Sequence, residues 1–284
     1  MASEIRTVAI VGSGIMACGL AEVVARAGYD VRVASRSQAS ADGVRRSIDS
    51  GFARAIERGK ATGDQRDEAM ARISTAEGFE SLGDCDLVIE SVIEDITVKL
   101  ALFADLDRAT KPSAILATNT STLPVIDLAL ATSRPEQVCG IHFFNPATLM
   151  NLVEVVRPLT ACDETIGTAL SFVSSLGKEA VEVRDHAGFI VNALLFPYLN
   201  NAVRMLERGT ASIESIDIAM KGGCNFPMGP FALLDLVGLD TSIAILETIH
   251  GSFGNPGDAP AQTLRELVAA GHLGRKTKQG FYAY

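Results

Sequence analysis

The sequence lacks an excess of basic residues, and this absence limits the partners that we expect for it. It has 25 Lys and Arg residues against 34 Asp and Glu residues, which gives a formal net charge of −9. Proteins that bind nucleic acids or anionic membrane surfaces carry basic patches that attract phosphate groups. We therefore expect neither a nucleic acid nor a membrane among its partners.

Paired cysteines are also missing. The five cysteines are odd in number, widely spaced and without a CxxC pair, and they are Cys18, Cys85, Cys139, Cys162 and Cys224. A disulfide framework or a structural zinc site needs cysteines in close sets. We expect single thiols in a reducing compartment and no metal site.

No apolar run is long enough to cross a membrane. The first residues, MASEIRTVAIVGSG, lead directly into a predicted strand. They have neither the long apolar region of a signal peptide nor the Arg- and Ser-rich lead of a transit peptide. We therefore expect a cytoplasmic protein.

The residues that are present indicate a globular chain of two unlike domains. Its 284 residues are 48% hydrophobic and 21% charged, which allows a sizeable core. Short apolar runs alternate with helical stretches, a pattern that predicts an α/β fold with a Rossmann-type, doubly wound, mostly parallel sheet. The predicted strands are Thr7–Val11, Val31–Ala34, Leu87–Glu90, Ala114–Ala117, Val138–His142, Leu152–Val156 and Val181–Val183.

Helical patterns complete this organisation. In the first domain they cover Ile15–Ala27, Thr97–Ala109, Glu164–Leu176 and an inserted helical hairpin at about residues 40–72. Only helices are predicted after the last strand, at Asn192–Glu207, Ile213–Met220, Phe231–Leu236 and Thr241–Thr248. We place the domain boundary near Arg184 and Asp185, with a dinucleotide-binding domain at 1–184 and a helical C-terminal domain at 185–284.

A glycine-rich turn, GSGIMA, joins the first predicted strand to the first predicted helix. Glycine at position 12 permits a tight turn, and glycine at position 14 lets the backbone approach a pyrophosphate at the helix N-terminus. The pattern is weak when it stands alone, but here it opens a βαβ unit. We predict a dinucleotide-binding loop; its cofactor-binding residues are Gly12, Ser13, Gly14, Ile15 and Met16.

The end of the second predicted strand differs from an ordinary NAD site. NAD enzymes usually have Asp or Glu there to bind the ribose 2′-hydroxyl, whereas this chain has Ser35 and Arg36. A serine hydroxyl and a guanidinium can bind a 2′-phosphate. The cofactor is therefore NAD or NADP, with NADP favoured; the alternative is that Arg36 points to solvent and either cofactor is used.

His142 and Glu154 lie in the apolar stretch IHFFNPATLMNLVEVV. His142 ends a predicted strand, where ligands bind in open α/β sheets, and Glu154 lies on the next strand. A carboxylate that contacts an imidazole fixes its tautomer and favours its protonated form, which suits a base that removes the proton of an alcohol. The alternative, a core histidine beside a structural ion pair, is equally compatible with these two residues.

Six segments together resemble the L-3-hydroxyacyl-CoA dehydrogenase family, in particular its short 3-hydroxybutyryl-CoA type. They are GSGIMACGLAEVVARAGYDV, NTSTLP, GIHFFNPATLMNLVEVV, GFIVNALLFPYLNNAVRMLERG, PMGPFALLDLVGLDT and LGRKTKQGFYAY, and they extend over essentially the whole chain. The resemblance implies an NAD(P)-dependent enzyme that acts on an acyl-CoA substrate. It also implies a C-terminal domain that binds substrate and forms a homodimer.

The resemblance implies roles for particular residues. His142 would be the catalytic base and Glu154 its charge partner, while Ser121 and Asn192 would form hydrogen bonds to the substrate and the histidine. The further cofactor contacts that it implies are Glu94, Lys99, Asn145 and, with less support, Lys276.

Each of these residues also has a plain structural interpretation. Ser121 could cap a turn, and Asn192 could lie on the polar face of a helix. Glu94 and Lys99 could be solvated charges at a helix start. Arg54, Arg58 and Lys60, on the predicted hairpin, are assigned to a charged outer face and are not predicted as a site.

Two rival functions are open at this point. A dehydrogenase of a free β-hydroxy acid would need a basic clamp for the substrate carboxylate. A non-catalytic dinucleotide-binding protein would need no base with a matched carboxylate. The presence of Ser121, His142, Glu154 and Asn192 together argues against the second.

Overall fold

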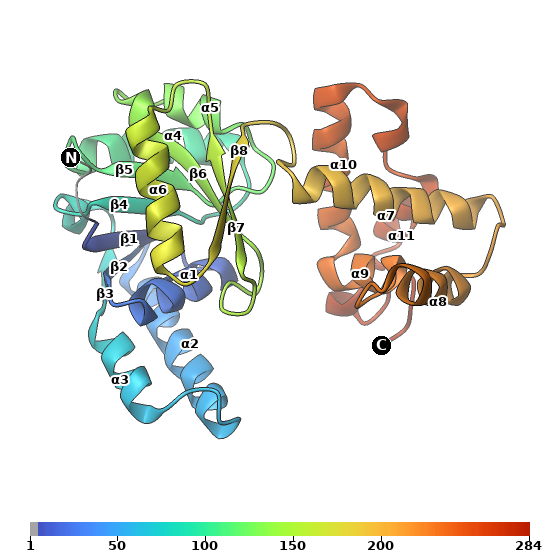
Figure 1. Ribbon diagram of the computed structural model, residues 1–284, viewed down its shortest axis with the longest axis horizontal. Helices are drawn as coiled ribbons and strands as arrows, with labels where there is room; N and C mark the ends of the chain where they lie inside the picture. The colour runs from blue at the N-terminus through green and yellow to red at the C-terminus, as the bar shows by residue number, and fades with distance from the viewer. Residues whose placement is uncertain (1–4) are drawn as a thin grey trace. The chain divides into compact units, whose positions relative to one another are not determined.

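The computed structural model describes residues 5–284. The chain divides into two compact units, Met1–His186 and Ala187–Tyr284. An eight-stranded sheet with flanking helices makes up the first unit, and the second is helical (Figure 1). The α/β fold class with a helical C-terminal domain is confirmed.

The sheet has the strand order β3-β2-β1-β4-β5-β6-β7-β8. All neighbours are parallel except β6 and β7, which are antiparallel. The strands are β1 Thr7–Val11, β2 Asp30–Ser35, β3 Ile73–Glu77, β4 Leu87–Glu90, β5 Ile115–Thr118, β6 Val138–Phe143, β7 Leu152–Arg157 and β8 Glu179–Arg184. The central strands β4, β5 and β6 are fully buried, as expected for strands covered on both faces.

The helices of the first unit are α1 Ile15–Arg26, α2 Gln38–Glu57, α3 Gly63–Ala71, α4 Ile96–Ala109, α5 Val125–Leu130 and α6 Asp163–Ser175; the short 3₁₀ helices are η1 Glu80–Leu82 and η2 Pro135–Gln137. Helices α2 and α3, which are drawn in blue to cyan in Figure 1, occupy the range in which a helical hairpin is predicted. Side-chain caps at Ser37 and Thr62 begin these two helices, and Gln65 completes a capping box with Thr62.

Two elements of this unit were not predicted. Strand β3, with the sequence ISTAE, lies at the edge of the sheet and buries only Ile73, so its apolar signal is weak. Helix α5 has six residues, too few to show a helical period.

The second unit consists of helices α7 Val191–Glu207, α8 Ile213–Cys224, α9 Pro230–Val237, α10 Leu239–Phe253 and α11 Gln262–Ala269, with η3 Pro256–Asp258 and η4 Arg275–Thr277. Its core includes Phe196, Leu199, Phe231 and Leu246. Buried Asp235 accepts hydrogen bonds from the backbone N–H groups of Phe281 and Tyr282, which holds the C-terminal segment. Helix α11 was not predicted. Within residues 5–284, no helix combines the length and the apolar character needed to span a bilayer.

Candidate active site

The glycine-rich turn between β1 and α1 has the shape of a phosphate-binding loop. Gly12 has a φ of +139°, and a Cβ atom there would lie 2.3 Å from the carbonyl oxygen of Ser91, so only glycine fits. Gly14 is the N-cap of α1, has no side chain to cap the helix, and has open space around its Cα. The backbone N–H groups of the first helical turn therefore face outward without a side-chain partner, which suits a pyrophosphate.

A hollow of about 450 Å³ lies beside this loop. Its lining consists of Ser13, Gly14, Ile15, Cys18, Ser40, Gly43 and Ser47. Met16 follows in the first turn of α1 and packs against the core of the first unit. These residues fit a bound dinucleotide because they combine small side chains, hydroxyl groups and free backbone donors.

The second predicted cofactor contact lies at the end of β2. The buried Ser35 hydroxyl donates a hydrogen bond to the carbonyl of Ser37 at 2.8 Å. Arg36 is exposed, and in the described part of the chain no hydrogen bond or ion pair holds its guanidinium. A carboxylate that sequence analysis missed is also present: Glu77, at the end of β3, lies opposite Ser35 in the strand register and accepts a hydrogen bond from the backbone of Gln38.

His142 and Glu154 are brought together by the antiparallel pairing of β6 and β7. They lie directly opposite each other, and Nδ1 of His142 is 2.8 Å from Oε2 of Glu154. Both side chains are buried. Gly140 helps to set this register, because a Cβ atom there would lie only 2.7 Å from the Cβ of Val156. The expectation that Glu154 comes alongside His142 is confirmed.

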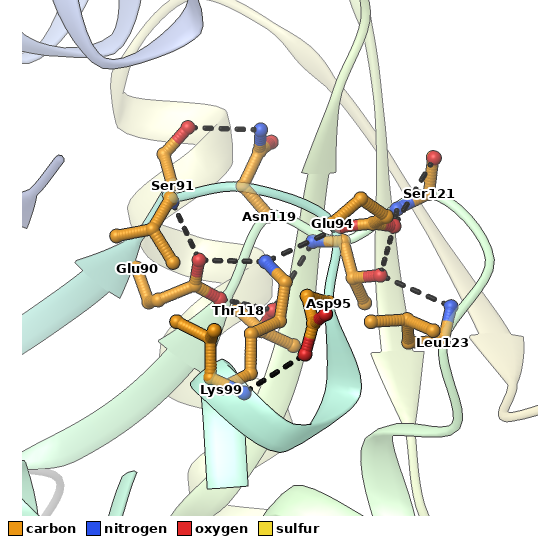
Figure 2. A network of polar contacts seen from close by, with 12 residues as sticks. Glu90, Ser91, Glu94, Asp95, Lys99, Thr118, Asn119, Ser121 and Leu123 are labelled. Carbon is orange, nitrogen blue, oxygen red and sulfur yellow. Dashed lines mark hydrogen bonds and ion pairs between the residues drawn. The ribbon is translucent and has the colours of Figure 1, made fainter. Parts of the chain in front are cut away.

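A network of buried polar groups lies at the carboxyl ends of β4 and β5 (Figure 2). Glu90 has no exposed surface, and its carboxylate accepts hydrogen bonds from the Lys99 ammonium at 2.6 Å and the Thr118 hydroxyl at 2.7 Å. The Lys99 side chain is 1% exposed. The interpretation of Lys99 as a solvated charge was therefore wrong. Glu90 was missed because a polar residue at the end of an apolar strand is not distinctive in the sequence.

Glu94 links this network to Ser121. Its carboxylate lies 3.3 Å from the Lys99 ammonium and accepts hydrogen bonds from the backbone N–H of Ser121 at 2.9 Å and from the Thr120 hydroxyl. Burial alone would raise the pKa of Glu94, but the Lys99 charge and these hydrogen bonds hold it below its usual range. The Ser121 hydroxyl lies 3.4 Å from the same carboxylate oxygen. Ser121 is thus held by a site network as well as by its turn.

Asn119, which was not predicted, connects the network to the strand of His142. The side-chain oxygen of Asn119 accepts a hydrogen bond from the backbone N–H of Phe143 at 2.9 Å, and the backbone N–H of Asn119 donates to the carbonyl of Glu90 at 2.8 Å. The ends of β4, β5 and β6 are therefore tied together beside Ser121 and His142. The residues NTST gave a sequence signal for this position, but the signal was assigned to Ser121 alone.

Three predicted residues remain, one in the first unit and two in the second. Asn145 is exposed, three residues after His142, and precedes a cis peptide bond to Pro146. In the second unit, Asn192 is buried in the first turn of α7, and the Lys276 ammonium lies 2.6 Å from both carboxylate oxygens of Asp240. The predicted contacts of these three residues with cofactor or substrate stay predictions.

Comparison with known proteins decides the family. The sequence model described as "3-hydroxyacyl-CoA dehydrogenase, NAD binding domain" matches residues 7–186, and the model of the C-terminal domain of the same family matches residues 188–284. The chain belongs to the 3-hydroxyacyl-CoA dehydrogenase family. It is accordingly an oxidoreductase, and its first unit is a Rossmann domain that binds a nicotinamide dinucleotide.

Individual members of this family resemble the chain over its full length. It is 43% identical to the 3-hydroxybutyryl-CoA dehydrogenase of Mycobacterium tuberculosis H37Rv, with 100% of both chains covered. It is 40% identical to the mitochondrial hydroxyacyl-coenzyme A dehydrogenase of Sus scrofa, with 99% of this chain and 91% of the relative covered.

Solved structures of the family give the same result. The crystal structure of FadB2 from M. tuberculosis superimposes with a TM-score of 0.97 at 43% identity and covers 99% of this chain and 100% of that one. The structure of (S)-3-hydroxybutyryl-CoA dehydrogenase from Ralstonia eutropha gives a TM-score of 0.96 at 40% identity, with 99% of each chain covered.

Proposed function

We propose that this member of the family oxidises the 3-hydroxyl group of a short acyl-CoA, 3-hydroxybutyryl-CoA, and catalyses the reverse reduction of acetoacetyl-CoA. The observation that carries the proposal is the buried His142–Glu154 pair at the carboxyl end of β6. The proposal is supported by the full-length relatives from M. tuberculosis and R. eutropha, which are 3-hydroxybutyryl-CoA dehydrogenases by name.

The geometry of the pair suits proton transfer. Because Nδ1 of His142 faces the Glu154 carboxylate, Nε2 is the ring nitrogen for exchange with the substrate hydroxyl. As the hydroxyl proton moves to Nε2, the C3–H bond breaks, its electron pair leaves as hydride, and a C3 carbonyl forms. The positive charge that then develops on the imidazole is balanced by Glu154. A bound nicotinamide supplies the hydride acceptor.

Other residues orient the reactants. In this proposal Ser121 and Asn192 are the hydrogen-bond partners of the reactants. Gly12, Ser13, Gly14, Ile15 and Met16 bind the pyrophosphate region, Ser35 and Arg36 bind the adenosine ribose, and Glu94, Lys99, Asn145 and Lys276 complete the cofactor contacts. Ser35 and Arg36 make NADP the favoured dinucleotide.

Assembly and location belong to the same proposal. We expect a homodimer because apolar side chains of the second unit, including Leu194 and Leu236, are exposed on the single chain. A cytoplasmic location agrees with five free cysteines, since thiols persist in reducing compartments. Burial also raises the pKa of Cys139 to about 12, which keeps that thiol unreactive.

A spectrophotometric assay tests the proposal. Oxidation of NADH or NADPH, followed by the loss of absorbance of the reduced nicotinamide, should depend on added acetoacetyl-CoA. Free acetoacetate at the same concentration is the matched control, because it presents the same keto group without coenzyme A. Equal activity with free acetoacetate would favour a dehydrogenase of free β-hydroxy acids and reject the acyl-CoA proposal.

A further inference from the structure

Two carboxylates share one ammonium group at the carboxyl ends of β4 and β5 (Figure 2). The buried Glu90 carboxylate lies 2.6 Å from the Lys99 ammonium, and the Glu94 carboxylate lies 3.3 Å from it on the other side. Among residues 5–284, no second lysine or arginine forms an ion pair with either carboxylate. The cluster of Glu90, Glu94 and Lys99 therefore carries one more negative than positive charge.

The two carboxylates differ in their surroundings, with Glu90 buried and Glu94 partly exposed. Glu90 is fully buried and is further held by the Thr118 hydroxyl and the backbone N–H of Val92. The Glu94 side chain is 38% exposed, so the excess negative charge is accessible to a ligand at the strand ends. A fixed charge in a partly buried site acts more strongly than the same charge in water.

The cluster lies where the nicotinamide half of a dinucleotide passes. In this fold the pyrophosphate sits at the glycine loop, and the two halves of the cofactor extend to either side along the carboxyl ends of the strands. Gly12 packs directly against the carbonyl of Ser91, at the start of the loop that carries Glu94. A ring that must reach His142 on β6 from this loop crosses the ends of β4 and β5, because these strands lie between β1 and β6.

We propose that the cluster of Glu90, Glu94 and Lys99 stabilises bound oxidised nicotinamide relative to the reduced form, with Glu90 as the buried positioning residue. The oxidised ring is a cation and the reduced ring is neutral, so an excess negative charge nearby stabilises only the first. This inference rests on the proposed function, because the path of the ring toward His142 assumes that His142 is the base.

Dissociation constants of the full-length protein for the oxidised and reduced dinucleotide test the inference. We expect Glu90→Gln, which keeps the shape of the side chain but removes its charge, to weaken binding of the oxidised form about three- to tenfold more than binding of the reduced form. Thr118→Val removes a hydrogen bond to Glu90 without a change of charge and should leave the ratio of the two constants unchanged.

A second control comes from the opposite end of β4. Asp86 immediately precedes that strand and forms an ion pair with Lys111, so Asp86→Asn removes a paired carboxylate far from the carboxyl ends of the strands. It should lower thermal stability and leave the ratio unchanged. A Glu90→Gln protein that weakens both forms equally, or neither, would overturn the inference.

A variant with a more exposed side chain keeps the test available if Glu90→Gln does not fold. Glu94→Gln removes the other negative charge and should change the ratio in the same direction; an unchanged ratio would overturn the inference. Failure of the proposed function has a different signature. A wild-type protein that binds the dinucleotide but does not reduce acetoacetyl-CoA would reject the substrate, whereas the ratio of dissociation constants is measured without substrate.

Discussion

His142 and Glu154 face each other across the antiparallel pair β6 and β7, with Nδ1 and Oε2 2.8 Å apart and both side chains buried. A buried carboxylate is costly unless it is paired, and a buried imidazole needs a partner that sets its tautomer. Each side chain therefore provides the partner that allows the other to be buried. The pair also lies at the strand end where an open α/β sheet binds its ligands, which separates it from a purely structural ion pair.

The first prediction concerns the base. His142→Ala should lower turnover of acetoacetyl-CoA by about a hundred- to ten-thousand-fold, because general acid–base transfer is lost. Cofactor binding, measured by titration, should persist because the glycine loop is untouched. His250, whose Nδ1 contacts the carbonyl of Asn255, gives a matched control: His250→Asn should keep normal turnover. A folded His142→Ala protein with near-normal turnover would refute the assignment.

The second prediction concerns the carboxylate. Glu154→Gln should lower kcat by about tenfold or more, which corresponds to about 1.4 kcal/mol in the barrier. The KM for the cofactor should stay unchanged. Glu182 on the neighbouring strand β8 is the control, because it pairs with Arg157 at the surface. If Glu154→Gln loses stability but keeps its rate, the glutamate is structural.

The third prediction concerns cofactor choice. Arg36 is exposed and forms no ion pair with any of residues 5–284, which leaves its guanidinium available for a 2′-phosphate, so kcat/KM should be higher with NADPH than with NADH. The double substitution Ser35→Asp with Arg36→Ile should swing the preference toward NADH by about 2 kcal/mol. A wild-type ratio that clearly favours NADH would show that these residues do not select NADP.

Glu77 offers an independent variant for the same question. Its carboxylate lies opposite Ser35 and would repel a 2′-phosphate. Glu77→Gln should therefore raise the NADPH-to-NADH ratio of kcat/KM, while Arg46→Ile, at an exposed position of α2, should leave it unchanged.

The fourth prediction concerns assembly. The side chains of Leu194 and Leu236 are 72% and 49% exposed on the single chain, and apolar groups of this kind are normally covered in the native assembly. Light scattering at micromolar concentration should give a mass of twice 30.0 kDa. A monomer mass would mean that this surface is not a homodimer interface.

The fifth prediction concerns stability and pH. Asp86 accepts hydrogen bonds from the backbone N–H groups of Arg6 and Thr7 and from the Lys111 ammonium. Although burial alone would raise the pKa of Asp86, these interactions hold it below its usual range. A carboxylate with a lowered pKa stabilises the fold above its unfolded pKa, and that contribution is lost as the pH falls through the folded value.

Asp86→Asn should therefore lower the free energy of unfolding by about 2 kcal/mol at pH 7, and this deficit should shrink in acid. Urea denaturation of both proteins at pH 7 and at pH 3 measures the difference. A deficit of the same size at both pH values would show that the charge of Asp86 contributes nothing and that only the shape of the side chain matters.

Much of the fold followed from local patterns. Apolar runs such as Leu87–Glu90 were identified as strands because they are buried on both faces, and the glycine loop was identified because its turn needs glycine at fixed spacing. Strand β3 and helix α5 were missed for the converse reason. One is a mostly polar edge strand and the other is too short to show a period.

Only the tertiary structure decided which charges meet. Lys99 and Thr118 follow Glu90 by 9 and 28 positions along the chain. Local periodicity does not show that these two residues, which lie on a helix and a second strand end, come within hydrogen-bond distance of Glu90. The opposition of Ser35 and Glu77 likewise depends on the register of β2 and β3. The sequence by itself determined most of the secondary structure and the residue types of the site, because short-range sterics and hydrophobic burial act locally. Pairing of buried charges is a property of distance in the folded chain, since a lone charge in the sequence looks the same whether it is solvated or paired.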